Sequence, residues 1–222
     1  TNMSAMFQGS TFNQDIGSWN VGALTNATNM FFGAALSTVN YDALLNGWDA
    51  QTLQPNVTFS GGNSLYCAGA TARANMIAND GWIITDAGAE SCYEVSYHAN
   101  NATGGTVPSS QTKYFDVDLT LATNSGGLVK TGYTFSGWNT QADGLGTHYA
   151  ENGTYTDNAA VTLYAEWTVN QYTITFNSAG GSPVADITQA YGTPVTAPAN
   201  PTRAGYTFAG WNPAVPATMP LG

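Results

Sequence analysis

The sequence contains very few basic residues. Among its 222 residues, four lysines and arginines stand against fourteen aspartates and glutamates, and the formal net charge is −10. Nucleic acids and anionic membrane surfaces are both bound through clusters of positive side chains. The four cations (Arg73, Lys113, Lys130 and Arg203) are too scattered to build such a cluster, so we expect neither kind of partner.

Long apolar runs are absent as well. The chain has no run of about 18 apolar residues, the length that a membrane-spanning helix needs, so we predict no membrane insertion within it. Its opening letters, TNMSAMF, have neither the basic start nor the apolar segment of a signal peptide. A repeat is already under way at residue 1, and we therefore expect the chain to be a piece of a longer protein.

Motifs for catalysis and metal binding are sparse. His98 and His148 are the only histidines, and no serine lies in a Gly-x-Ser-x-Gly context. Asp116 and Asp118 alternate along one predicted strand, which is typical of a solvated sheet face. The Asp-Gly-x-Gly segment that starts at Asp143 lacks the other oxygen ligands of a calcium loop and is interpreted as a β-turn. We predict a protein that is not an enzyme and that holds no cofactor and no metal.

The N-terminal part contains an internal repeat. Thr-Asn, Met-Phe and Gly at residues 1–9 recur 24 positions later at residues 25–33, and Gly-Ser-Trp at 17–19 is echoed at 46–48 after an insertion. A period near 24 is typical of leucine-rich-repeat-like solenoids, whose units must stack to bury their apolar faces.

Two helices are predicted within this region. The first has Asn40 as N-cap, turns over residues 41–45 and Gly47 as its stop. In the second, Thr71 caps the segment ARANMIAND and Gly81 ends it, with Met76 and Ile77 facing inward together with Ala72 or the stem of Arg73. Residues 82–85 are predicted to follow as a buried closing strand. Residues 36–92 are accordingly interpreted as the cap of a solenoid.

These N-terminal segments resemble a known family. The pattern TNMSAMFQGSTFNQDIGSW, followed by NYDALLNGW, VTFSGGNSLYCAG and ARANMIANDGWIITDAG, is similar to the BspA-type leucine-rich-repeat surface proteins of bacteria. The resemblance covers about residues 1–92. It implies a secreted or surface-anchored protein whose repeat array binds proteins or glycans, and it implies no catalytic residues.

The remainder of the chain has the alternating pattern of β-strands. Residues 93–98, 172–177 and 161–167 fit the period of two, and Gly-rich turns follow the first two of these segments. The heptad GYTFSGW at 132–138 returns as GYTFAGW at 205–211. We interpret its aromatic residues as a buried structural framework shared by two modules: Tyr133, Phe135, Trp138, Tyr206, Phe208 and Trp211. The alternative is an exposed aromatic platform that stacks on sugars.

This half resembles the internalin B-type repeat, also called the Listeria–Bacteroides repeat. Its features here are a strand opening with Tyr, the Gly-Tyr-Thr-Phe-x-Gly-Trp heptad, the segment NTQADGLGTHY at 139–149 and LYAEW at 163–167. The resemblance implies small β-grasp-like modules at 93–168 and 169–222. The second departs from the pattern after Trp211, because it lacks the Asp-Gly-x-Gly turn and the last strand. Either the natural chain continues, or another chain supplies the strand.

The fold class predicted from all these segments is mainly β. We expect the C-terminal part and cap of a leucine-rich-repeat-like solenoid with two short helices at 1–92, then tandem β-grasp-like modules, the second incomplete. In an outward-facing protein Cys67 and Cys92 would form one disulfide, whereas a cytosolic chain would keep two free thiols. Neither cysteine has the neighbours of a zinc site.

The predicted function is adhesion at the bacterial cell surface or outside the cell. The solenoid would bind an extracellular protein or glycan, and the β modules would act as spacers. The alternative is a structural subunit of an extracellular filament or matrix, in which copies of the chain exchange strands through an open β edge. The sequence does not identify the ligand-binding residues.

Overall fold

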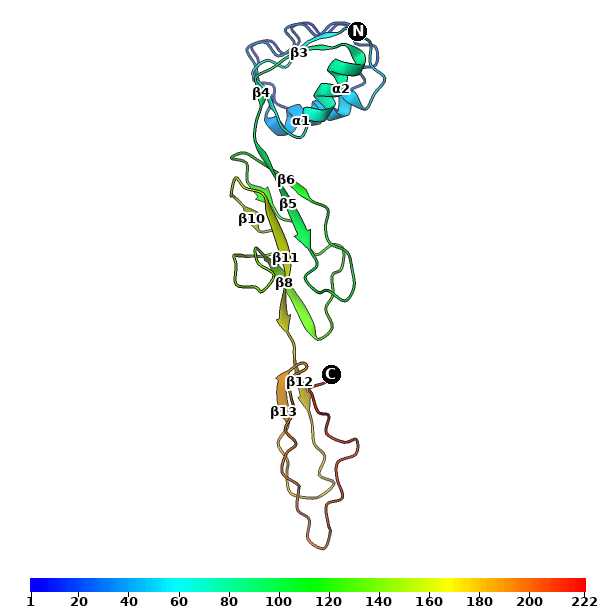
Figure 1. Ribbon diagram of the computed structural model, residues 1–222, viewed down its shortest axis with the longest axis vertical. Coiled ribbons are helices and arrows are strands. Elements are labelled where there is room, and N and C mark those ends of the chain that lie inside the picture. The colour runs from blue at the N-terminus through cyan, green and yellow to red at the C-terminus, as the bar shows by residue number, and fades with distance from the viewer. The chain divides into compact units, whose positions relative to one another are not determined.

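The computed structural model describes residues 1–222, which consist mainly of short β-strands with two helices (Figure 1). The chain divides into two compact units whose boundary runs through the first β repeat. Unit 1 comprises residues 1–95, 110–120 and 154–161, and unit 2 comprises residues 96–109, 121–153 and 162–222.

The N-terminal residues of unit 1 form coils stacked in parallel. The backbone N–H of Met3 donates to the carbonyl of Asn26 at 2.8 Å, and Phe7 repeats this contact with Met30 at 2.9 Å. Ser4 Oγ donates to the carbonyl of Thr28, 24 residues later in the sequence. The 24-residue recurrence is therefore the spacing at which one coil lies on the next.

Short parallel strands continue this stack. Strand β1 (Thr58–Ser60) pairs with β3 (Ile83–Thr85), and β2 (Leu65–Tyr66) pairs with β4 (Gly88–Ala89). The predicted buried strand at 82–85 is correct only in part, because Trp82 and Ile84 are buried whereas Ile83 is exposed. Strand β3 lies at the end of the stack, where the outward face has no partner.

Helix α1 is longer than the sequence predicts. It runs over Thr38–Asp49, and Ser37, not Asn40, is its N-cap: the Ser37 hydroxyl accepts a hydrogen bond from the backbone N–H of Asn40. Gly47 lies inside the helix and does not end it. A β-carbon at Gly47 would overlap the backbone of Gly17, so glycine is needed there for close packing.

Helix α2 covers Ala70–Asp80, and Gly81 ends it in the left-handed conformation (φ 68°), as predicted. The helix begins one residue before Thr71, which is not its cap. Met76 and Ala72 are buried, but Ile77 is exposed, so the inward face includes fewer residues than expected. In Figure 1 both helices lie on the side of the coil stack opposite β3.

Aromatic rings fill the core between the coils and the helices. Trp48 and Phe59 have ring centroids 5.3 Å apart, and Trp82 contacts both at 6.2 Å. The indole N–H groups of Trp48 and Trp82 donate to the carbonyls of Ile16 and Gln54. Each buried indole is thus satisfied, which avoids the free-energy cost of an unpaired buried donor.

The first β repeat contains a five-stranded sheet with the order β6-β5-β11-β8-β9. Strand β11 therefore lies between β5 and β8, and β8 pairs with it in antiparallel orientation. A separate two-stranded ribbon joins β7 to β10. The bounds are β5 Cys92–His98, β6 Gln111–Tyr114, β7 Leu119–Thr120, β8 Tyr133–Asn139, β9 His148–Tyr149, β10 Thr154–Tyr155 and β11 Val161–Val169.

The second repeat keeps the opening hairpin of this plan and one antiparallel bridge, between Pro194 and Thr218. Strand β12 (Gln171–Ile174) pairs antiparallel with β13 (Ile187–Ala190), so the predicted strand at 172–177 is shorter than expected. The heptad at 205–211 forms no strand and makes one isolated bridge, between Arg203 and Tyr206. A strand needs a hydrogen-bonded neighbour, and no counterpart of β11 exists among residues 1–222.

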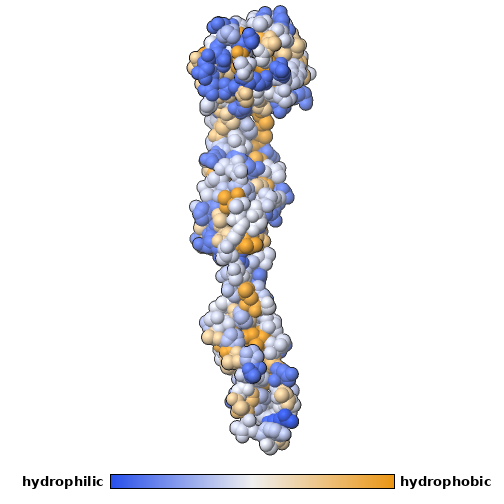
Figure 2. Space-filling model, turned by 90° about the vertical axis from the view of Figure 1, so that its right-hand side faces the viewer, coloured by the Kyte–Doolittle hydropathy of each residue, from blue (hydrophilic) through white to orange (hydrophobic).

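The face shown in Figure 2 carries hydrophobic residues as separate patches among hydrophilic ones. None of the helices has the length and apolar character that crossing a bilayer requires.

Candidate functional site

Asp42 in α1 is buried and organises the start of α2. Its carboxylate accepts hydrogen bonds from the backbone N–H groups of Cys67, Ala68 and Gly69 at 2.8–2.9 Å. Burial, followed by the charge of Asp42 and a hydrogen bond to it, raises the pKa of Tyr114 in β6 to about 12. No sequence pattern singles out Asp42, because an aspartate inside a helix does not indicate its distant partners.

A disulfide joins Cys67 to Cys92, the first residue of β5. The Cα atoms are 6.0 Å apart and no cysteine is free. The bond covalently ties the loop before α2 to the first β repeat. The hydrogen bonds of Asp42 act at the same place, so this connection is fixed both covalently and by buried polar contacts.

A second polar network joins Arg73 and Tyr41 to Asp86. Arg73 Nε donates to Asp86 Oδ2 at 2.7 Å, and the Tyr41 hydroxyl donates to the same oxygen at 2.9 Å. Burial, together with the charge of Asp86, raises the pKa of Tyr41 above its ordinary value. All three side chains have a partner within this network, which connects α1 and α2 to the segment after β3.

The first heptad packs as a framework. Trp138 is fully buried, its indole N–H donates to the carbonyl of Ala122 at 2.8 Å, and its ring lies 4.6 Å from that of Tyr97. Phe135 contacts Trp138 at 5.1 Å and Trp167 of β11 at 5.6 Å. Tyr133 lies partly exposed at the start of β8.

The second heptad keeps some of these contacts and loses others. Trp211 lies 4.9 Å from Phe176 and 5.2 Å from Phe208, which repeats the ring pairs of the first copy. However, the indole nitrogen of Trp211 is buried without a hydrogen-bond partner. Tyr206 is 68% exposed. The expectation that the two heptads are buried alike is therefore wrong for Tyr206, because the strand that would cover it is missing.

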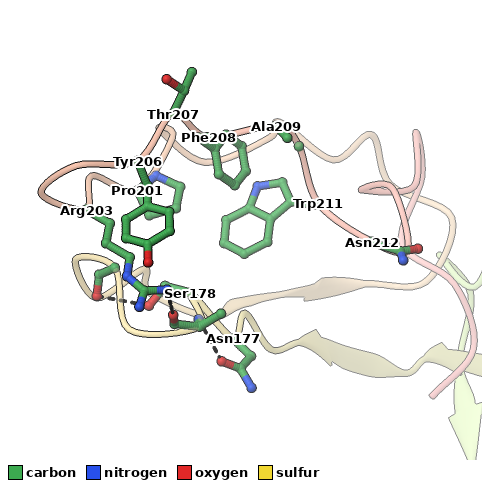
Figure 3. A pocket seen from close by; sticks show the side chains of 13 residues that line it. Asn177, Ser178, Pro201, Arg203, Tyr206, Thr207, Phe208, Ala209, Trp211 and Asn212 are labelled. Carbon is green, nitrogen blue, oxygen red and sulfur yellow. Dashed lines mark hydrogen bonds between the residues drawn. The ribbon is translucent and has the colours of Figure 1, made fainter.

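A hollow of about 260 Å³ opens beside the second heptad. Figure 3 shows the rings of Tyr206, Phe208 and Trp211 along one wall, with Arg203 beside Tyr206. The other wall is formed by residues 177–181, which follow β12. Arg203 also lies over the ring of Tyr206, 4.2 Å from its centroid.

In the first repeat, the corresponding space between two strands is occupied by β11. There β11 lies between β5 and β8, and the counterparts of these two strands are β12 and the heptad at 205–211. The hollow thus corresponds to the position of a β11-type strand. Its shape follows from the architecture of the module, and we assign no ligand to it.

An aromatic cluster on the stacked coils was not identified in the sequence. Phe7 and Phe12 stack at 4.0 Å between centroids, and Trp19 lies 6.1 Å from Phe7. Phe7 and Phe12 are partly exposed and Trp19 is exposed. Neighbouring exposed rings of this kind are typical of surfaces that bind proteins or sugars.

His148 and Asp143, two polar candidates from the sequence, lie in a surface contact and a turn. His148 Nδ1 lies 2.8 Å from Glu166 Oε2, on the surface of the first repeat. Asp143 accepts a hydrogen bond from the backbone N–H of Leu145, as a turn residue does. No three histidine, cysteine, aspartate or glutamate side chains lie close enough together to hold a metal ion.

Comparison with known families agrees with the two-repeat plan. Residues 93–166 and 172–216, more than half of the chain, match the model of the Listeria-Bacteroides repeat domain. The chain belongs to this repeat family. Residues 1–64 match a second model, described as a Mycoplasma protein of unknown function. No solved structure matches the chain.

Three curated relatives cover this repeat protein in part. A putative Gly-rich membrane protein of Evansella cellulosilytica is 38% identical over 54% of the chain and 14% of its own length. A putative membrane protein of the same organism is 39% identical over 37% of the chain and 12% of its own length. Internalin H of Listeria monocytogenes is 37% identical over 37% of the chain and 15% of its own length. The chain therefore spans less than a sixth of each relative.

Proposed function

We propose that this repeat protein is a non-catalytic, surface-associated protein of a bacterium, exposed outside the cytoplasm. The observation that carries the proposal is the disulfide between Cys67 and Cys92. Disulfides persist in oxidising compartments and are rare in the cytosol. The relatives support the same location, because two are named membrane proteins and the third is an internalin.

Residues 1–92 are proposed to be the end and cap of a BspA-type leucine-rich-repeat solenoid, and the two repeats to be β-grasp-like spacer modules. The parallel stacking of coils supports the first assignment. The five-stranded sheet of the first repeat supports the second.

The proposed use is adhesion to an extracellular protein or glycan through the coils. The partly exposed rings of Phe7, Phe12 and Trp19 support this choice, since aromatic side chains contribute strongly to binding at interfaces. Exposed rings of this type also stack on the apolar faces of sugars.

The test immobilises the chain and measures its binding to extracellular matrix proteins and to purified bacterial and host glycans. We expect one ligand class to be retained and the Trp19→Ala variant to lose at least about tenfold in affinity, as for a typical aromatic contact residue. The control is Leu145→Ala, which removes an 81% exposed side chain from the first repeat and leaves binding unchanged. Retention of no ligand, or equal affinities for both variants, contradicts the proposal.

A further inference from the structure

Lys113 in β6 is the most unusual residue of the first repeat. It is fully buried, although lysines almost never are. Its Nζ donates to the carbonyl of Tyr114 at 2.9 Å and to Asn158 Oδ1 at 3.0 Å. The two ion pairs of the chain, Arg73–Asp86 and His148–Glu166, do not include it. A buried ammonium without a carboxylate partner is costly in free energy, so the site calls for an explanation.

The side-chain amide of Asn158 is held by three groups. Its Oδ1 accepts from Lys113 Nζ and also from the backbone N–H of Asp116 at 2.9 Å. Its Nδ2 donates to Asp116 Oδ1 at 2.6 Å. Asp116 has a positive φ of 52°, a conformation that is uncommon outside glycine and that lets one residue contact both ends of the amide. The amine of Lys113 and the carboxylate of Asp116 thus contact the two ends of one side-chain amide.

We propose that Lys113 and Asn158 form an intramolecular isopeptide bond, with Asp116 as the general acid and base. The amine form of Lys113 attacks Asn158 Cγ, and the new Nζ–Cγ bond forms while the backbone N–H of Asp116 stabilises the charge on Oδ1. Once the bond has formed, Nζ and Nδ2 share the same carbon, and Asp116 Oδ1, which contacts Nδ2 at 2.6 Å, takes one proton from Nζ and passes it to Nδ2. The Cγ–Nδ2 bond then breaks and one ammonia leaves. The products are a secondary amide and ammonia, with no oxidant or other reactant.

The surroundings suit a single reaction of this type. Lys113 is enclosed, whereas Asp116 is exposed at the surface, so ammonia can leave on that side. Water has little access to Nζ. The amine is therefore not covered by a hydration shell and is free to attack the amide carbon. The two residues are 45 positions apart in the sequence. The bond would join β6 to the segment that leads into β11, and it would hold the first repeat closed under mechanical load.

The second repeat offers an internal comparison. Lys113 pairs with Tyr93 across the β5–β6 hairpin, and at the equivalent place Gln189 pairs with Tyr172 across β12–β13. The Gln189 amide donates to the carbonyls of Thr193 and Pro194 and has no amine to attack with. The constellation therefore belongs to the first repeat alone, and it does not depend on any ligand of the coils.

Intact mass of the purified chain, reduced and denatured after folding, tests the proposal. We expect a mass below the sequence value by one ammonia, about 17 Da. Trypsin should fail to cleave after Lys113, and a branched fragment should link residue 113 to residue 158. The full sequence mass in the folded wild-type chain overturns the proposal without reference to any variant.

Three variants separate the isopeptide bond from other losses of ammonia. Lys113→Gln introduces the residue of the second repeat and should restore the sequence mass, as should Asn158→Ala, whereas Asp116→Ala should slow the loss by at least about a hundredfold. Lys130→Gln is the matched control and should keep the loss. A loss that persists in Lys113→Gln is a succinimide at an asparagine and contradicts the proposal.

Discussion

The two repeats share a heptad but not a structure. In the first, Tyr133–Asn139 is a strand paired with β11, and Trp138 is buried with its indole N–H satisfied. In the second, the same letters form no strand, and the indole nitrogen of Trp211 has no partner. Local ring contacts persist in both copies. Strand formation and burial, by contrast, depend on a neighbour that only the first repeat contains.

The largest expected difference concerns the two tryptophans. Trp138→Ala should lower the unfolding free energy of the first repeat by about 3–5 kcal/mol, because it empties a filled core position. Trp211→Ala should lower that of the second repeat by about 1 kcal/mol, since its ring is partly exposed and its N–H unpaired. Hydrogen exchange in urea, followed on peptides from 133–169 and from 171–190, measures both. Equal losses of unfolding free energy in the two variants would show that the two tryptophans are equally well packed, contrary to this comparison.

Next in size is the glycine before each tryptophan. Gly137 (φ 137°) and Gly210 (φ 126°) have similar backbones, but a β-carbon at Gly137 would lie 2.5 Å from the carbonyl oxygen of Tyr149, whereas one at Gly210 meets nothing within 4 Å. Gly137→Ala should cost on the order of 2–3 kcal/mol and Gly210→Ala about 1 kcal/mol, the second from backbone strain alone. The same exchange measurement applies. A larger loss of unfolding free energy in Gly210→Ala than in Gly137→Ala would show that other atoms pack against Gly210 in solution.

Tyr114 gives the first repeat a pH dependence at a position where the second repeat has Ala190. The pKa of Tyr114 is raised from 10.0 to about 12, so above pH 10 the unfolded chain loses this proton before the folded one does. The contribution is complete below pH 10 and is lost as the pH rises toward 12.

Urea unfolding of unit 1 between pH 9 and pH 12 should therefore show a fall that is smaller in Tyr114→Phe. Part of the fall should remain in this variant, because the pKa of Tyr41 is also raised. Tyr206→Phe, in the second heptad, is the control and should leave the fall unchanged. An identical pH profile for Tyr114→Phe and the wild type would show that Tyr114 does not contribute to this loss of stability.

The smallest effect should be the same in both copies. Lys130 lies over Tyr133 at 4.4 Å and Arg203 over Tyr206 at 4.2 Å. Each substitution to alanine should cost about 0.5 kcal/mol, the value of an exposed cation–π contact. Chemical denaturation of the two variants checks this. A clear difference between them would mean that even this local contact depends on the missing strand.

Much of the organisation could be predicted from the chain alone. The 24-residue period corresponds to a real stacking interval, Gly81 ends α2, and the strands at 92–98 and 161–169 follow from alternation and flanking turns. These features depend on neighbours in the sequence. The error at Gly47 arose because a helical glycine was interpreted as a stop without knowing that Gly17 lies against α1. The N-cap was placed three residues too late, at Asn40 instead of Ser37.

The sequence by itself determined the repeats, the family and the positions of long strands such as β5 and β11, because each depends on local patterns of side chains. The disulfide between Cys67 and Cys92, predicted for an outward-facing protein, is confirmed. Only the tertiary structure decided that Asp42 receives three backbone hydrogen bonds and that Lys113 and Asp116 both contact Asn158. The partners in each of these hydrogen bonds are 25 to 45 residues apart. Their contacts arise from how the chain folds back on itself, and no local pattern in the sequence records them.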